Sequence, residues 1–162
     1  MLRRVVGFLL LLLACIVPAI AQLPSAKLLA MVDAHAYQDF PKREDILAVI
    51  EIESKFDPKA HGLGGRGLMQ VRGGSLNPKK NLEQGIGYLR DMFLLFGSEH
   101  KAFLAYNAGP GRVMQGKGKG LRNAAKYLKK VLAVRSFYVV KAEPENLSVS
   151  EPETLIILDP DP

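Results

Sequence analysis

The chain has 162 residues, a formal net charge of +6 and a single cysteine. This length is enough for one domain with one hydrophobic core. One cysteine cannot form an internal disulfide bond, so we expect the stability of the fold to come from packing.

The amino terminus has the pattern of a secretory signal over residues 1–21. Two arginines precede an apolar run over residues 5–17, and residues 19–21 (Ala-Ile-Ala) form a small-residue cleavage pattern. The run is shorter than a membrane span requires. We therefore expect export to the periplasm or cell envelope, with no transmembrane span in the mature protein. Cys15 lies in a loose lipobox-like sequence, which leaves lipid anchoring as the alternative to ordinary cleavage.

The charge is unevenly distributed along the chain. Residues 1–141 contain all 22 Lys and Arg, whereas residues 142–162 contain six acidic residues and no base. A basic body suits an anionic polymer or surface, although plain solubility would explain the same charge. The export signal and the lack of a nucleic-acid motif argue against nucleic acid as the partner. We expect the Pro- and Glu-rich residues 142–162 to form a disordered tail.

Apolar periodicity predicts a mostly α-helical domain over residues 25–138. Ser25 can cap a first helix whose apolar positions recur as far as Phe40. A second helix is predicted over about residues 43–54, and it ends before an Asp-Pro pair. The first half of the domain is thus expected to be a pair of helices.

A long loop and an amphipathic helix are predicted next. Residues 57–79 are rich in Gly, Pro and Asn, which favours a loop with one short helical turn near Leu68. Asn81 can cap the third helix, which is expected to end at Gly97. A loop of this length inside a compact domain is usually functional or disordered.

Two further helices complete the predicted domain. The fourth spans about residues 99–107 and leads into a Gly-Pro-Gly stop. A flexible basic loop over residues 115–120 separates it from the last helix, which covers about residues 121–137. The sequence shows no internal repeat, so a single domain is expected.

Glu51 and Glu53 are rival candidates for acid chemistry at the end of the second helix. At 100° per residue, Glu53 falls between the radial positions of Ile46 and Val49, on the apolar stripe. Glu51 falls on a mixed side of the helix. An apolar wall disfavours the charged form of a carboxyl group, so the pKa of Glu53 should be raised and the group should suit a general acid. A carboxylate paired with a buried arginine is the alternative interpretation of Glu53.

Three short motifs follow one another along the chain: Glu53-Ser54, then Gly67-Leu68-Met69-Gln70, then Ala105-Tyr106-Asn107-Ala108-Gly109-Pro110-Gly111. In this order and spacing they resemble the soluble lytic transglycosylase (SLT) family, over roughly residues 25–135. The resemblance implies a lysozyme-like fold and cleavage of peptidoglycan glycan strands. It implies that Glu53 is the sole catalytic acid and base. It also implies a set of substrate-binding residues: Ser54, Met69, Gln70, Tyr106, Asn107 and Tyr127.

The same resemblance assigns roles within that set. Gln70 contacts the sugar, Met69 packs beneath the cleft, and Asn107 helps to hold the substrate. Tyr106 directs its hydroxyl toward the catalytic carboxyl group. The chain departs from the family pattern at Arg72, which stands where an apolar cleft residue is usual.

No second carboxylate in the sequence suits the two-acid mechanism of ordinary glycosidases. The resemblance implies that Glu53 protonates the bond between N-acetylmuramic acid and N-acetylglucosamine. Glu53 then takes the proton of the muramic C6 hydroxyl, which closes a 1,6-anhydro ring without a metal or cofactor. Two alternatives stay open. One is a hydrolytic muramidase of the goose-lysozyme kind, and the other is a non-catalytic protein of wall binding or secretion assembly.

The expected partner is the glycan strand of peptidoglycan. By analogy with small family members, the small size of the chain suggests an enzyme that opens local gaps for a secretion or pilus apparatus. We expect the mature protein to be a monomer.

Overall fold

The computed structural model describes residues 24–142. The expected signal, Cys15 and the acidic tail lie outside the described residues. In chain order the elements are α2 (Ala26–Asp33), α3 (Arg43–Ser54), β1 (Gly65–Arg66), β2 (Val71–Arg72), α4 (Pro78–Phe96), α5 (Glu99–Ala108), α6 (Pro110–Gln115) and α7 (Lys119–Ala142). The predicted mostly helical fold is confirmed. Within the described part of the chain, no helix is both long and apolar enough to span a membrane.

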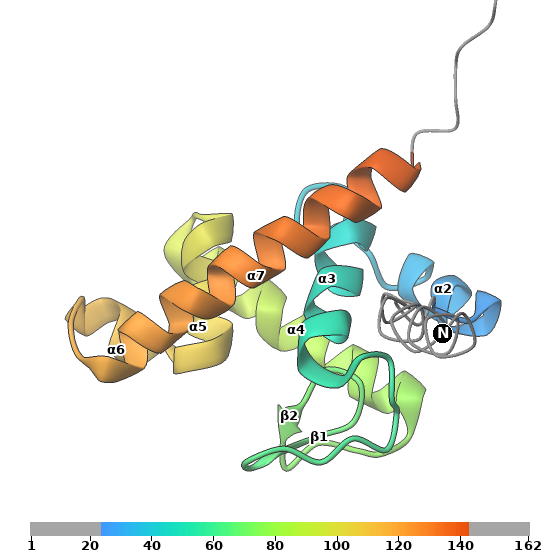
Figure 1. Ribbon diagram of the computed structural model, residues 1–162, viewed down its shortest axis with the longest axis horizontal. Helices are drawn as coiled ribbons and strands as arrows, with labels where there is room; N and C mark the ends of the chain where they lie inside the picture. Colours follow the sequence, from blue (N-terminus) through green and yellow to red (C-terminus); the bar gives the residue numbers. More distant parts are fainter. Residues whose placement is uncertain (1–23, 143–162) are drawn as a thin grey trace, which may run out of the picture.

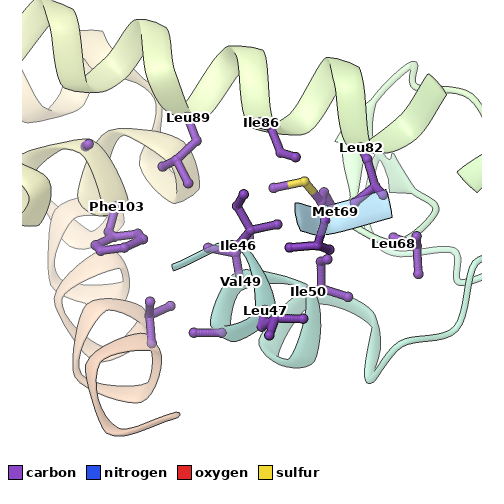
Figure 2. Close-up of a cluster of buried hydrophobic side chains, with 14 of the residues drawn as sticks. Ile46, Leu47, Val49, Ile50, Leu68, Met69, Leu82, Ile86, Leu89 and Phe103 are labelled. Carbon is purple, nitrogen blue, oxygen red and sulfur yellow. The ribbon is translucent and has the colours of Figure 1, made fainter. Parts of the chain in front are cut away.

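Helix α3 lies at the centre of the molecule, with the long helix α7 running across it (Figure 1). Side chains from α3, α4 and α5 point into one apolar cluster, which the loop before α4 completes (Figure 2). The buried members of this cluster include Ile46, Leu47, Val49, Ile50, Leu68, Met69, Leu82, Ile86, Leu89 and Phe103. The core therefore packs around the helix that ends in Glu53.

A buried ion pair fixes α3 against α7. Asp45 is fully buried, and its Oδ1 lies 2.7 Å from Nε of Arg135. The same guanidinium reaches Glu99 on α5, with Nη1 and Oε2 3.0 Å apart. The other Asp45 oxygen, Oδ2, accepts a hydrogen bond from the Lys42 main-chain N–H at 2.8 Å, which starts α3. Burial raises the pKa of Asp45 to about 6, so the arginine and the helix start compensate a costly buried charge.

Helix α2 is shorter than predicted. Ser25 caps it as expected, with its hydroxyl accepting a hydrogen bond from the Leu28 N–H at 3.2 Å. The helix ends at Asp33, and Phe40 lies beyond it in a non-helical segment. Phe40 is nevertheless fully buried. Its apolar character follows from its place in the core, and it made the predicted helix too long because it fitted the helical spacing by sequence.

The predicted helical turn near Leu68 is wrong. The chain instead forms an antiparallel hairpin in which Gly65 pairs with Arg72 and Arg66 pairs with Val71. The connecting turn begins at Gly67 with φ of 77° and ends at Gln70 with φ of 49°. Left-handed backbone at both ends is incompatible with a right-handed helix.

The cap predicted for α4 is also wrong. Asn77 caps the helix by accepting a hydrogen bond from the Lys80 N–H at 3.1 Å, and Pro78 occupies the first turn. Asn81 lies one turn inside the helix and is fully buried. Proline at the first helical position was the signal for this earlier start.

Asn81 ties the hairpin to α4. Its Oδ1 accepts a hydrogen bond from the Met69 N–H at 2.8 Å, and its Nδ2 donates to the carbonyl oxygens of Arg66 and Ser75, both at 2.9 Å. A Cβ atom at Gly67 would come within 2.5 Å of Nδ2, so only glycine lets the turn approach this amide. One buried side chain thus satisfies three main-chain groups of the loop.

The carboxyl-terminal half contains one helix that was not expected. Residues 110–115 form α6, which begins at Pro110 and is followed by the cap residue Gly116 with φ of 68°. Helix α7 begins at Lys119 and continues beyond the predicted end at residue 137. The Tyr138 hydroxyl donates to Oε2 of Glu51 at 2.6 Å, so tertiary contacts with α3 extend along this last helix.

We predict that Asn81→Ala costs about 3 kcal/mol of unfolding free energy, because it leaves one buried and two partly buried main-chain groups unpaired. Asn77→Ala is the matched control. It removes an exposed cap on the same helix and should cost about 1 kcal/mol. Urea denaturation of both variants compares the two costs. Equal costs would contradict the role given to Asn81.

Candidate active site

A cleft of about 780 Å³ opens beside the end of α3. The hairpin and the loop before it line one part, and the junction between α5 and α6 lines another. Figure 1 shows the hairpin next to the carboxyl-terminal end of α3. The lining residues are Glu53, Gly62, Leu63, Gly64, Gly65, Gln70, Val71, Arg72, Tyr88, Tyr106, Asn107, Ala108, Gly109 and Arg112. Among them Glu53 supplies the only carboxyl group.

Glu53 projects from the last turn of α3 and is half-buried. Burial raises its pKa to about 7, because a charged carboxylate is poorly solvated there. It forms no ion pair with any described residue, which removes support for the alternative of a buried arginine partner. A carboxyl group of this kind holds its proton at near-neutral pH and can deliver it.

Glu51 has a different environment on the same helix. Its carboxylate accepts the hydrogen bond from the Tyr138 hydroxyl, and it does not line the cleft. The radial argument from the sequence therefore separated the two glutamates correctly. Glu51 has a structural partner, whereas Glu53 faces the cavity.

Two tyrosines lie near Glu53. The Tyr106 hydroxyl donates to the Met69 carbonyl oxygen at 2.7 Å, and burial, with a smaller effect from the charge of Glu53, raises the pKa of Tyr106. Tyr127 also interacts with Glu53, and this contact lowers the pKa of Glu53 against the larger effect of burial. The contact is loose, because the buried Tyr127 hydroxyl makes no hydrogen bond of normal geometry to any described residue.

Three of the predicted substrate-binding residues, Ser54, Met69 and Tyr127, lie outside the cleft lining. Met69 is fully buried beneath the cleft, against Gly85 of α4, so its side chain is not available to a substrate. Its carbonyl oxygen serves the cleft indirectly by holding Tyr106. The Ser54 hydroxyl donates to the Ile50 carbonyl at 3.1 Å within α3.

Gln70 and Asn107 do line the cleft, and they come from the hairpin turn and from α5. Nε2 of Gln70 donates to the carbonyl oxygens of Ala60 and Gly67, at 3.1 and 2.9 Å, so this amide group braces the loop. Asn107 is exposed at the end of α5. Of the predicted set, Glu53, Gln70, Tyr106 and Asn107 meet around one cavity.

Sequence reasoning missed Tyr88 and Arg112 as cleft residues. The Tyr88 ring lies 5.5 Å from the Tyr106 ring, between centroids, and extends the aromatic wall. Arg112 belongs to α6, which was not predicted. The Gly109-Pro110 pair was the available signal, since proline favours the first position of a helix.

The described residues contain no group of three or more His, Cys, Asp or Glu side chains placed to hold a metal ion. His61 forms an isolated bridge with Arg66 and does not line the cleft. The chemistry of the cleft thus rests on one carboxyl group, tyrosines, amides and arginines.

Comparison with known proteins agrees with this architecture. The fold is similar to that of the 70 kDa soluble lytic transglycosylase SLT70 from Escherichia coli, with a TM-score of 0.63 and 24% sequence identity over 70% of this chain and 24% of that chain. The chain thus spans about a quarter of that protein's length. The domain is lysozyme-like and helical.

A family model places the chain more narrowly. Residues 72–130 match the transglycosylase SLT domain. The match includes Tyr106, Asn107 and Tyr127, and it begins after Glu53 and Gln70. Together the two findings support the family resemblance: residues 72–130 match the SLT domain, and the described residues have a lysozyme-like fold.

The raised pKa of Glu53 has a consequence for stability. An unfolded glutamate ionises near pH 4.5, while the folded group ionises near 7. Below pH 4.5 the group is protonated in both states and costs nothing. As the pH rises from 4.5 to 7, ionisation of Glu53 favours the unfolded state more and more. The resulting loss of unfolding free energy reaches at most about 3 kcal/mol above pH 7.

We therefore predict that Glu53→Gln is more stable than the wild type at pH 8 and that the advantage shrinks toward pH 5. Urea unfolding at both pH values measures it. Glu51→Gln is the control, because it weakens a hydrogen bond to Tyr138 and should not stabilise the fold at either pH. A Glu53→Gln variant no more stable than the wild type at pH 8 would rule out a strained, unpaired carboxylate.

Proposed function

We propose that this protein is a peptidoglycan lytic transglycosylase in which Glu53 is the only acid and base. The observation that supports this most strongly is the cleft itself, where one buried carboxyl group with a pKa near 7 has no carboxylate partner. The SLT domain match is the second support, because it indicates peptidoglycan as the substrate class.

The first step uses the proton that Glu53 holds near neutral pH. Glu53 donates it to the oxygen between N-acetylmuramic acid and N-acetylglucosamine, and the bond from that oxygen to the muramic C1 breaks. Positive charge develops at C1, and the N-acetyl group of the same sugar stabilises it. The leaving sugar departs with the proton as a free hydroxyl group.

The second step reverses the role of the same carboxyl group. Glu53, now ionised, removes the proton of the muramic C6 hydroxyl, and the C6 oxygen bonds to C1. The product is a 1,6-anhydro ring, water is not consumed, and Glu53 regains its proton. A pKa near 7 suits both roles, because the group must give and take a proton in one cycle.

Other side chains would orient the substrate and the acid. Tyr127 approaches Glu53 from α7 and can hold the carboxyl group in position while it changes charge. Asn107 is exposed in the cleft and offers an amide to the sugar. Gln70 retains its amide oxygen as an acceptor, since the hydrogen bonds that brace the loop use the nitrogen.

The alternatives are less well supported. A hydrolytic muramidase needs a group to hold the attacking water, and Glu53 is the only carboxyl group of the described residues that line the cleft. A non-catalytic wall-binding protein would not need the costly burial of Glu53. We place the substrate, and hence the site of action, in the cell envelope. A role beside a secretion or pilus apparatus and a monomeric state stay predictions.

The test is digestion of purified peptidoglycan followed by mass spectrometry. Wild-type protein should release muropeptides with 1,6-anhydro ends, which are lighter by one water molecule than hydrolytic products. Glu53→Gln should lower the rate by about a thousandfold, the scale of general acid–base catalysis. Glu51→Gln, which changes a carboxylate outside the cleft, should stay within tenfold of the wild type.

Two outcomes would overturn the proposal. Hydrated reducing ends would identify a muramidase. Equal release of products by Glu53→Gln and the wild type would remove Glu53 from the chemistry.

A further inference from the structure

The cleft has two cationic side chains that the proposed reaction does not use. Arg72 comes from β2 and Arg112 from α6, and both line the same cavity as Glu53. No other described residue that lines the cleft is acidic. While Glu53 is protonated, the two guanidinium groups therefore face the cavity without a negative charge to balance them.

Arg72 is free to bind a ligand. It is exposed, and its guanidinium makes no hydrogen bond or ion pair with any described residue. Its charge lowers the pKa of Tyr88, against the larger raising effect of burial, so the guanidinium lies near that ring. Arg72 is thus a cation beside the aromatic wall of the cleft.

Arg112 is held in place where α6 lines the cleft. Its Nη1 donates to the Ala108 carbonyl oxygen at 2.7 Å. Its side chain lies over Gly120, where an added Cβ would come within 2.8 Å of Cδ. One donor is used to anchor the guanidinium, and the others are available to a ligand.

The two arginines come from different elements of the lining, the hairpin and α6. They can therefore meet different parts of a substrate bound in the cleft.

We propose that Arg72 and Arg112 bind carboxylate groups of the substrate, so that the cleft selects glycan with free carboxylates over neutral glycan. A guanidinium group binds carboxylates through paired, charge-assisted hydrogen bonds. The identity of the glycan rests on the proposed function. In peptidoglycan the carboxylate has two sources: the stem peptide, or the lactyl group of a muramic acid that has lost its stem.

The experiment measures binding, so that it does not depend on turnover. Soluble glycan fragments are titrated against Glu53→Gln protein, alone and combined with Arg72→Gln, Arg112→Gln or Arg72→Lys. Arg66→Gln is the matched control, because Arg66 lies on the paired strand and does not line the cleft. Three fragments are compared: one with stem peptides, one stripped by an amidase to free lactyl carboxylates, and one with its carboxyl groups converted to amides.

We expect Arg72→Gln and Arg112→Gln each to weaken binding of the stem-bearing fragment about tenfold, the scale of one charged hydrogen bond. Binding of the amide-converted fragment should be unchanged. Arg72→Lys should recover part of the loss, and Arg66→Gln should have no effect. In the stem-bearing fragment the lactyl carboxyl group is bound in an amide, so arginine dependence with that fragment assigns the stem peptide, whereas dependence that appears only after amidase treatment assigns the lactyl carboxylate.

Equal losses for the acidic and the amide-converted fragments, or no loss for either, would overturn the inference. Thermal unfolding of each variant checks that the fold is retained. A different result would contradict the proposed function while leaving this inference intact. If the wild type releases no anhydro products while binding still depends on the arginines, the cleft recognises acidic glycan without cutting it.

Discussion

The burial of one unpaired carboxyl group is the constraint on which the candidate site depends. Helix α3 is buried over residues 45–50, and its last turn carries Glu53 to the edge of that core. Asp45, at the other end of the helix, is also a buried carboxyl group, and its charge is compensated by Arg135. Glu53 has no such cationic partner among the described residues, and the resulting rise of its pKa lets it hold a proton near neutral pH, as the proposed role of acid requires.

The remaining elements keep that carboxyl group both dry and reachable. Helix α7 contacts α3 through Arg135 and Tyr138. Nearer its start, the same helix places Tyr127 beside Glu53. Asn81 holds the hairpin against α4, so that the loop lines a cavity. The side chains that stabilise the fold are thus largely distinct from those that face the cleft.

The sequence predicted those features of the site that depend on a single helix or loop. Helical geometry distinguished Glu53 from Glu51, since the face of a helix follows from spacing alone. It could not predict the contacts of the Tyr106 and Tyr127 hydroxyl groups, because the two residues come from different helices and their placement depends on packing. Asn81 illustrates the same limit: its residue type suits a cap, but a buried loop uses its three hydrogen bonds. Arg112 was missed with the short helix that presents it.

The cleft joins a lone acid to a basic lining, which suits an acidic glycan that supplies its own nucleophile. Both features depend on Glu53 holding its proton when the substrate binds. An NMR titration of the Glu53 side-chain carboxyl in the wild-type protein measures this directly. We predict a pKa of about 7. An ordinary glutamate value, near 4.3, would contradict the proposal that one buried carboxyl group serves as both acid and base.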